Sequence, residues 1–151
     1  MNREELQIYL GSFGTMSFEE GGEWINLMVD PADFRALMEK LRSDELVLFD
    51  YLFCLTCVDW KTHLTMVYHL SSTRYRYNIV VKSKLNRDKP EIETVCDIWR
   101  TAEFHEREVY ELFGVNFLHH PDLRLLILPD GWEGKNPLRK DFEDEVNMIK
   151  L

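Results

Sequence analysis

Histidines and carboxylates gather around one predicted helix, and these residue types are common ligands of zinc and iron. A stand-alone metal-dependent enzyme is therefore one hypothesis. The spacing favours structural roles instead, because Glu106 and Glu108 are two positions apart on a helix and face different ways. His119 and His120, beside a proline, are a poor chelating pair. The full set of candidate ligands is His105, Glu106, Glu108, His119 and His120.

Cys54 and Cys57 have the spacing of a redox or zinc motif. In a strand this odd spacing puts the two thiols on opposite faces, and their apolar neighbours are typical of a core. We therefore predict buried, inert thiols, since free cysteine behaves as a small hydrophobic residue. With Cys96 the chain has three cysteines, too few for a disulfide framework or for the four thiolates of a standard iron–sulfur cluster.

Composition narrows the choice of partners. The chain has 151 residues with 27 acidic and 18 basic side chains, and its formal net charge is −9. This charge opposes binding to nucleic acid or anionic lipid, so basic protein surfaces are the expected partners. No apolar run approaches the roughly 18 residues of a membrane helix. The N-terminus lacks the pattern of a targeting signal, which predicts a cytoplasmic location.

The helix that carries the central charges is predicted over Ala102 to Phe113. Thr101 can cap its start and Gly114 can end it. Glu103, Arg107 and Glu111 stand four residues apart, so the arginine can pair with a carboxylate on either side. Taken alone, this pattern is typical of a solvated ladder of ion pairs.

The elements upstream must position that helix. Asn2 with Glu5 forms a capping box for a first helix that stops at Gly11, and Asp30-Pro31 starts a second helix that carries Phe34 to Leu41. Alternation predicts strands over 13–18, 24–29, 52–60, 63–70 and 75–83, the first two forming a hairpin. We expect Tyr75, Tyr77, Ile79 and Val81 to point inward, a polar loop over 84–90, and a short helical turn near Thr94.

This order predicts an α+β two-layer sandwich, with a mostly antiparallel sheet and helices on one face. The sequence indicates a single domain over 1–151, comprising an α+β core over 1–114 and an extended, partner-docking tail over 115–151. Five breakers between Pro121 and Pro137 predict an irregular tail. Its leucines argue against disorder, so we expect it to lie partly on its own sheet and partly on another subunit. Exchange protection in the isolated chain should be weak from Phe117 to Leu151.

Four blocks, together and in order over roughly 40 residues, resemble a known family. They are Glu106-Arg107-Glu108, Glu111-Leu112-Phe113-Gly114, His120-Pro121-Asp122-Leu123-Arg124 and Pro137-Leu138-Arg139-Lys140-Asp141-Phe142. They closely resemble the 30-kDa subunit family, the C-type subunits, of the respiratory NADH:quinone oxidoreductase (complex I). A weaker resemblance extends upstream through 55–59, 67–70 and 94–99.

The resemblance implies a peripheral-arm subunit at the cytoplasmic face of a prokaryotic inner membrane, in contact with the membrane only through its complex. It implies a scaffold for a proton-translocating enzyme, lying against the quinone-site subunit. It further implies no catalytic residue, metal or cofactor in this chain, with FMN and iron–sulfur clusters in partner subunits.

The same resemblance implies which residues lie at the partner boundary, the charged ones being candidates for ion pairs. These are Glu106, Arg107, Glu108, Glu111, Gly114, His120, Pro121, Asp122, Arg124, Pro137, Leu138, Arg139, Lys140 and Asp141. Some positions depart from the common pattern, among them Leu125 after Arg124 and Asn136 before Pro137. Similar subunits occur in membrane-bound hydrogenases and ferredoxin-linked complexes, so an equivalent subunit of such a complex is the alternative.

Overall fold

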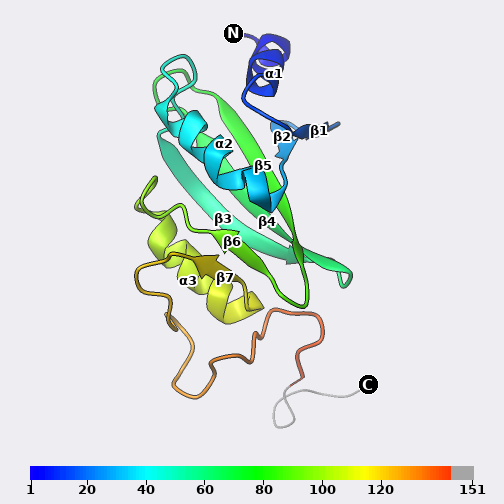
Figure 1. The fold of residues 1–151 in the computed structure, drawn as a ribbon, viewed down its shortest axis with the longest axis vertical. Helices are drawn as coiled ribbons and strands as arrows, with labels where there is room; N and C mark the ends of the chain where they lie inside the picture. The colour runs from blue at the N-terminus through cyan, green and yellow to red at the C-terminus, as the bar shows by residue number, and fades with distance from the viewer. Residues whose placement is uncertain (144–151) are drawn as a thin grey trace.

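The computed structural model describes residues 1–143. The described chain forms three helices and seven strands (Figure 1). Their order is α1 (Arg3–Gly11), β1 (Ser17–Glu19), β2 (Ile25–Met28), α2 (Pro31–Ser43), β3 (Tyr51–Asp59), β4 (His63–Ser71), β5 (Asn78–Asn86), β6 (Glu91–Glu93), α3 (Ala102–Phe113) and β7 (Asn116–Leu118).

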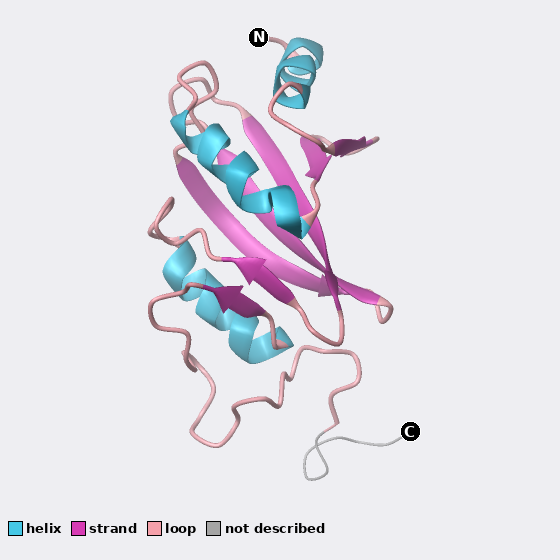
Figure 2. Cartoon of the chain, viewed as in Figure 1, coloured by secondary structure: helices cyan, strands magenta, loops and turns pink. Residues whose placement is uncertain are grey.

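The main sheet has five strands in the order β1-β2-β5-β4-β3. All its pairings are antiparallel except that of β2 with β5, which is parallel. Helix α2 crosses one face of this sheet, and α3 lies beside β3 (Figure 2). The predicted α+β class, with a mostly antiparallel sheet and helices on one face, is confirmed.

The N-terminal elements begin where their capping residues predict. Asn2 and Glu5 form the reciprocal capping box of α1. Asp30 caps α2 by accepting a hydrogen bond from the Ala32 amide at 3.0 Å. The hairpin of β1 and β2 forms, but β1 is only three residues long and starts at Ser17 rather than Phe13.

The core lies between the main sheet and the helices. Leu64, Met66, Tyr68 and Leu70 alternate along β4 as predicted, and all four are fully buried. The Tyr68 ring packs on Phe34 of α2 with 4.8 Å between centroids. One continuous apolar cluster therefore joins the helices to the sheet.

The prediction for β5 is wrong at both ends. The strand starts at Asn78 rather than Tyr75, because residues 72–77 form a turn in which Arg76 has a φ of +59°. Tyr75 is exposed and Tyr77 is half-buried at the edge of the core, and their rings stack with 5.8 Å between centroids. The expected polar loop starts late, since the strand continues to Asn86 and buries Leu85.

A second sheet was not predicted. Strands β6 and β7 pair in parallel, with Ile92 opposite Phe117, and both of these side chains are buried. Each strand has only three residues, too few for alternation to show in the sequence. Regular structure therefore extends past Gly114 to Leu118, where an irregular chain was expected.

Helix α3 has the predicted bounds. Gly114 ends it in the left-handed region at a φ of +80°. The predicted cap is wrong, since the Thr101 hydroxyl donates to the Leu52 carbonyl of β3 and accepts no hydrogen bond from an amide of its own helix. This bond ties the start of α3 to the edge of the main sheet.

Candidate partner-docking site

Three charged residues of α3 are buried. Glu106 is 0% exposed, Glu111 1% and Arg107 6%. Burying a charge is unfavourable unless it is paired or hydrogen-bonded, so each of these side chains must have partners inside the molecule. Two of the three find them in the tail.

Glu111 binds three successive backbone amides of the tail. Its carboxylate accepts hydrogen bonds from Leu126 at 2.8 Å, Ile127 at 3.0 and 3.1 Å, and Leu128 at 3.2 Å. Successive N–H groups that converge on one anion form a backbone nest. This nest compensates the desolvation of Glu111 and fixes the local path of the tail.

Arg107, one turn earlier on α3, binds the preceding carbonyls. Its guanidinium donates to the Arg124 oxygen at 3.2 Å and to the Leu125 oxygen at 2.7 Å. The ion-pair ladder suggested for Glu103, Arg107 and Glu111 is therefore wrong. Arg107 and Glu111 together hold five consecutive tail residues, 124–128, by their backbone.

The tail also caps the C-terminal end of α3. Leu138 donates its amide to the Leu112 carbonyl at 2.9 Å, and the Arg139 guanidinium donates to the Phe113 carbonyl at 2.6 Å. These carbonyls belong to the last turn of a helix, which has no internal donors for them. A side chain at Gly114 would clash with Asn136, so glycine also permits the close approach of the tail.

A third anchor lies at the end of β3. Asp59 is buried, and its carboxylate accepts hydrogen bonds from the Lys140 and Lys61 amides at 2.8 Å each and from the Arg87 guanidinium. Burial alone would raise the pKa of Asp59, but these hydrogen bonds and the cationic Arg87 outweigh it and hold that pKa below its usual value. Arg87 also lies 3.4 Å from Asp141.

His120 is held in one tautomer by two backbone groups. Its Nδ1 accepts from the Asp122 amide at 3.0 Å, so its Nε2 carries the proton and donates to the Glu103 carbonyl at 3.1 Å. Asp122 also pairs with Arg124 at 3.0 Å, and both side chains are substantially exposed. This pair is an ion pair within the tail, of the kind predicted.

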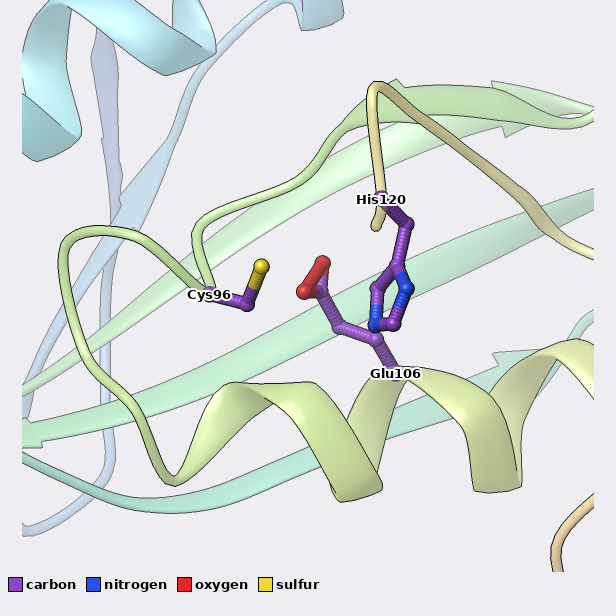
Figure 3. A group of neighbouring side chains, drawn as sticks. All are labelled: Cys96, Glu106 and His120. Atoms are coloured by element: carbon purple, nitrogen blue, oxygen red, sulfur yellow. The ribbon is translucent and has the colours of Figure 1, made fainter. Parts of the chain in front are cut away.

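Glu106 faces a small polar cluster rather than the tail backbone (Figure 3). One oxygen lies 2.6 Å from the Thr94 hydroxyl, and the other accepts from the Val95 amide at 3.3 Å. Burial raises the pKa of Glu106 to about 8, even though both hydrogen bonds oppose the rise. Burial therefore favours the neutral form of Glu106.

Metal binding is the sharpest alternative for this cluster. Within the described residues, the potential ligand atoms of Cys96, Glu106 and His120 lie within 4.8 Å of one another. The local hydrogen bonds do not suit a metal, because both His120 nitrogens are engaged and Nε2 presents a proton. The acid and the thiol would also have to lose protons that burial helps them keep.

The other cysteines also fit structural roles. Cys57 is buried, and burial raises the pKa of its thiol to about 12. Cys54 is only half-buried, less than predicted, because the register of β3 against β4 shifts between Leu52 and Cys54.

The predicted boundary residues fall into three groups. Glu106, Arg107 and Glu111 are buried inside the chain. The half-buried members are Gly114, His120, Asp122, Pro137 and Arg139, and the exposed members are Glu108, Pro121, Arg124, Leu138, Lys140 and Asp141. Only the exposed and half-buried residues are available to another subunit in this conformation.

Two apolar residues of the tail were absent from the predicted boundary. Leu126 is 37% exposed and Ile127 68% exposed, although the backbone of both is bound by Glu111. In the sequence, their apolar side chains argued only against disorder. The anchors Asp59, Arg87 and Thr94 were also missed as site residues, because their contacts cross 12 to 81 positions of sequence.

A family model described as the 30-kDa subunit of respiratory-chain NADH dehydrogenase matches residues 27–146. The chain belongs to this family. It is 47% identical over 120 residues to the C/D subunit of the NADH-quinone oxidoreductase of Phocaeicola vulgatus, a match that covers 75% of this chain and 23% of that protein. The chain thus spans about a quarter of this longer relative.

Two other comparisons cover most of both chains. The C-type subunit of the F(420)H(2) dehydrogenase of Methanosarcina mazei is 38% identical over 126 residues, covering 78% of this chain and 80% of that one. A chain in the archaeal membrane-bound sulfane sulfur reductase is 28% identical with a TM-score of 0.79, covering 93% and 84%. Among the described residues, no helix has the length and apolarity to cross a membrane.

Replacing Glu111 with alanine should lower the free energy of unfolding by about 3 kcal/mol, because three amides lose a charged acceptor. Glu108→Ala, on the exposed side of the same helix, is the matched control and should change it by no more than about 0.5 kcal/mol. Urea unfolding measures both values. Equal losses in the two variants would show that the nest does not hold the tail.

Glu106→Gln should change how stability depends on pH. The pKa of Glu106 is about 8 in the folded chain against 4.5 ordinarily, so the folded state binds the extra proton between these values. The contribution of Glu106 to the free energy of unfolding is therefore complete below its ordinary pKa, and it is lost as the pH rises through about 8. Glutamine stays neutral, so the free energy of unfolding of the variant, relative to the wild type, should rise with pH.

Urea unfolding of both proteins at about pH 5 and about pH 8 measures this difference. Glu108→Gln, at an exposed position, serves as the control and should show no such rise. A constant difference between Glu106→Gln and the wild type at the two pH values would mean that Glu106 titrates normally.

Proposed function

We propose that this chain is a non-catalytic scaffold subunit in the peripheral arm of a membrane-bound oxidoreductase of the complex I type. Its docking surface is the anchored tail segment 124–128, together with the exposed boundary residues on either side. The observation that carries the proposal is that the backbone and the side chains of this segment have different roles. Its backbone is bound to Glu111 and Arg107, while Leu126 and Ile127 present apolar side chains outward.

This arrangement suits binding rather than catalysis. Fixing the backbone before association lowers the ordering cost that binding must otherwise overcome. Exposed apolar side chains on a fixed segment provide the contact area. The buried side chains Glu106, Arg107 and Glu111 are engaged in hydrogen bonds within the chain.

The partner we propose is the subunit that helps form the quinone site. Relatives from Phocaeicola and Bacteroides are joint C/D proteins. A C-type and a D-type part of one chain stay close together, so we propose the D-type subunit as the partner and assign the quinone-site role to it. We further propose that this chain holds no FMN or iron–sulfur cluster of its own, since three cysteines are fewer than a cluster's four thiolates. These cofactors would lie in partner subunits, and the membrane would be reached only through the complex.

A second candidate keeps the scaffold role but changes the electron donor. The relative from Methanosarcina mazei belongs to an F(420)H(2) dehydrogenase, and the similar solved chain belongs to a sulfane sulfur reductase. A scaffold with no cofactor of its own would be compatible with different donors, because electrons do not pass through it.

Ile127→Asp should release the chain from its complex while leaving the isolated chain folded. A carboxylate at this position would have to be desolvated against an apolar partner, whereas an exposed substitution changes stability by no more than about 0.5 kcal/mol. The experiment purifies the membrane complex from cells that produce the variant and measures how much of this chain and of the quinone-site subunit it retains.

Ile8→Asp provides the matched control, since Ile8 is exposed on α1, far from the tail in sequence. It should leave the complex intact. Full retention of the Ile127→Asp chain would contradict the proposed docking surface, and absence of the wild-type chain from any membrane complex would contradict the scaffold role.

A further inference from the structure

The main sheet has a second face that no helix covers within residues 1–143. Helices α2 and α3 both lie on the face that carries Tyr68, since Phe34 of α2 packs on its ring and the buried apolar residues of α3 belong to the same core cluster. The opposite face carries the side chains of alternate positions in the paired strands. These are Asn26, Met28, Cys54, Thr56, Val58, Thr65, Val67, His69, Val80, Lys82 and Lys84.

An antiparallel sheet that faces water on one side normally alternates apolar residues inward with polar residues outward. This outer face departs from that rule. Val67 and Val80 are apolar and nearly buried there, with 8% and 5% of their surface exposed. Trp24, Phe53 and His69 add an aromatic group whose centroids lie 5.6 to 5.8 Å apart.

A shallow hollow opens at one end of this face. Its apolar lining includes Val58, Val67 and the ring of Trp60, which is 58% exposed. Lys82 and Lys84 lie on its rim. A contiguous apolar surface with a polar rim is the usual form of a protein-binding site.

The charges of this face are unlike those of the chain as a whole. The chain has 27 acidic and 18 basic residues, yet strands β2 to β5 contain one acidic residue, Asp59, and it is bonded to Arg87 on the inner side. Glu19 reaches the rim from β1 and pairs with Lys82 at 2.9 Å. Lys84 has no acidic partner within 4 Å among the described residues.

We propose that this outer face binds an acidic, amphipathic segment of a second neighbouring subunit in the same complex. The apolar side of that segment would cover Val58 and Trp60, and its carboxylates would meet Lys84 and the rim. The inference rests on the proposed scaffold function and adds a second interface to the one made by the tail.

The charges argue against two other occupants. A second copy related by twofold symmetry would bring Lys84 into the interface from both sides without a carboxylate to pair with it. An extended anionic lipid surface would face many of the acidic groups that give the chain its net charge of −9, whereas a short acidic segment meets only the charges within a Debye length of about 8 Å of this face. An acidic protein segment therefore fits this face best.

Photo-crosslinking in the intact complex tests the proposal. The crosslinking residue p-benzoylphenylalanine is placed at position 60 in one variant and at position 127 in another, and the products are identified by mass spectrometry. Position 60 should crosslink to an acidic segment of a subunit other than the one that position 127 reaches. No product at position 60, or crosslinking to lipid or to another copy of this chain, would overturn the inference.

The two proposals fail differently. A complex that contains this chain and crosslinks at position 127 alone leaves the scaffold function standing and overturns the second interface. A chain that enters no complex overturns both.

Charge reversal gives an independent readout. Lys84→Glu should increase release of the chain from the purified complex at a fixed salt concentration by about tenfold, because like charges would then face each other. Lys89→Glu is the matched control, since Lys89 is exposed in the loop that follows β5 and is outside the hollow. Equal release of the two variants would overturn the inference.

Discussion

The hydrogen bonds between helix α3 and the backbone of segment 124–128 are the constraint on which the tail depends. Glu111 and Arg107 are buried charges whose partners are peptide groups of a segment without regular structure. Without the tail, both charges would lose these partners; without both side chains, the tail would lose its fixed path. Truncating one member of such a buried arrangement generally costs more than an exposed ion pair contributes.

The other anchors extend the same principle to the rest of the tail. Arg139 and the Leu138 amide satisfy the last carbonyls of α3, and Asp59 accepts the Lys140 amide at the end of β3. Each of these hydrogen bonds involves a polar group of the core domain that needs a hydrogen-bond partner, namely a helix-end carbonyl or the buried Asp59 carboxylate. The tail is thereby joined to α3, to the end of β3, to β6 through β7 and to the loop after β5, while Leu126, Ile127 and Leu138 stay exposed.

How far the sequence could predict this molecule depended on the range of the interactions. Capping residues such as Asn2 and Asp30, and the alternation along β4, gave correct elements because their signals are local. Strands β6 and β7 were missed since three residues show no period. The ion-pair ladder was wrong because a spacing of four residues marks neighbours on a helix but does not reveal that the tail competes for the same side chains.

The family blocks contain Arg107 and Glu111 but did not show what these side chains contact, and they left out Leu126 and Ile127. Glu111 and Arg107 bind the backbone of the same chain, so in this structure they set the path of the tail. The most direct test is hydrogen exchange of the isolated full chain, resolved at single amides. The Leu126, Ile127 and Leu128 amides should exchange slowly without any partner, in place of the weak protection that the sequence alone suggested. Exchange of all three at the rate of an unstructured peptide would contradict the account.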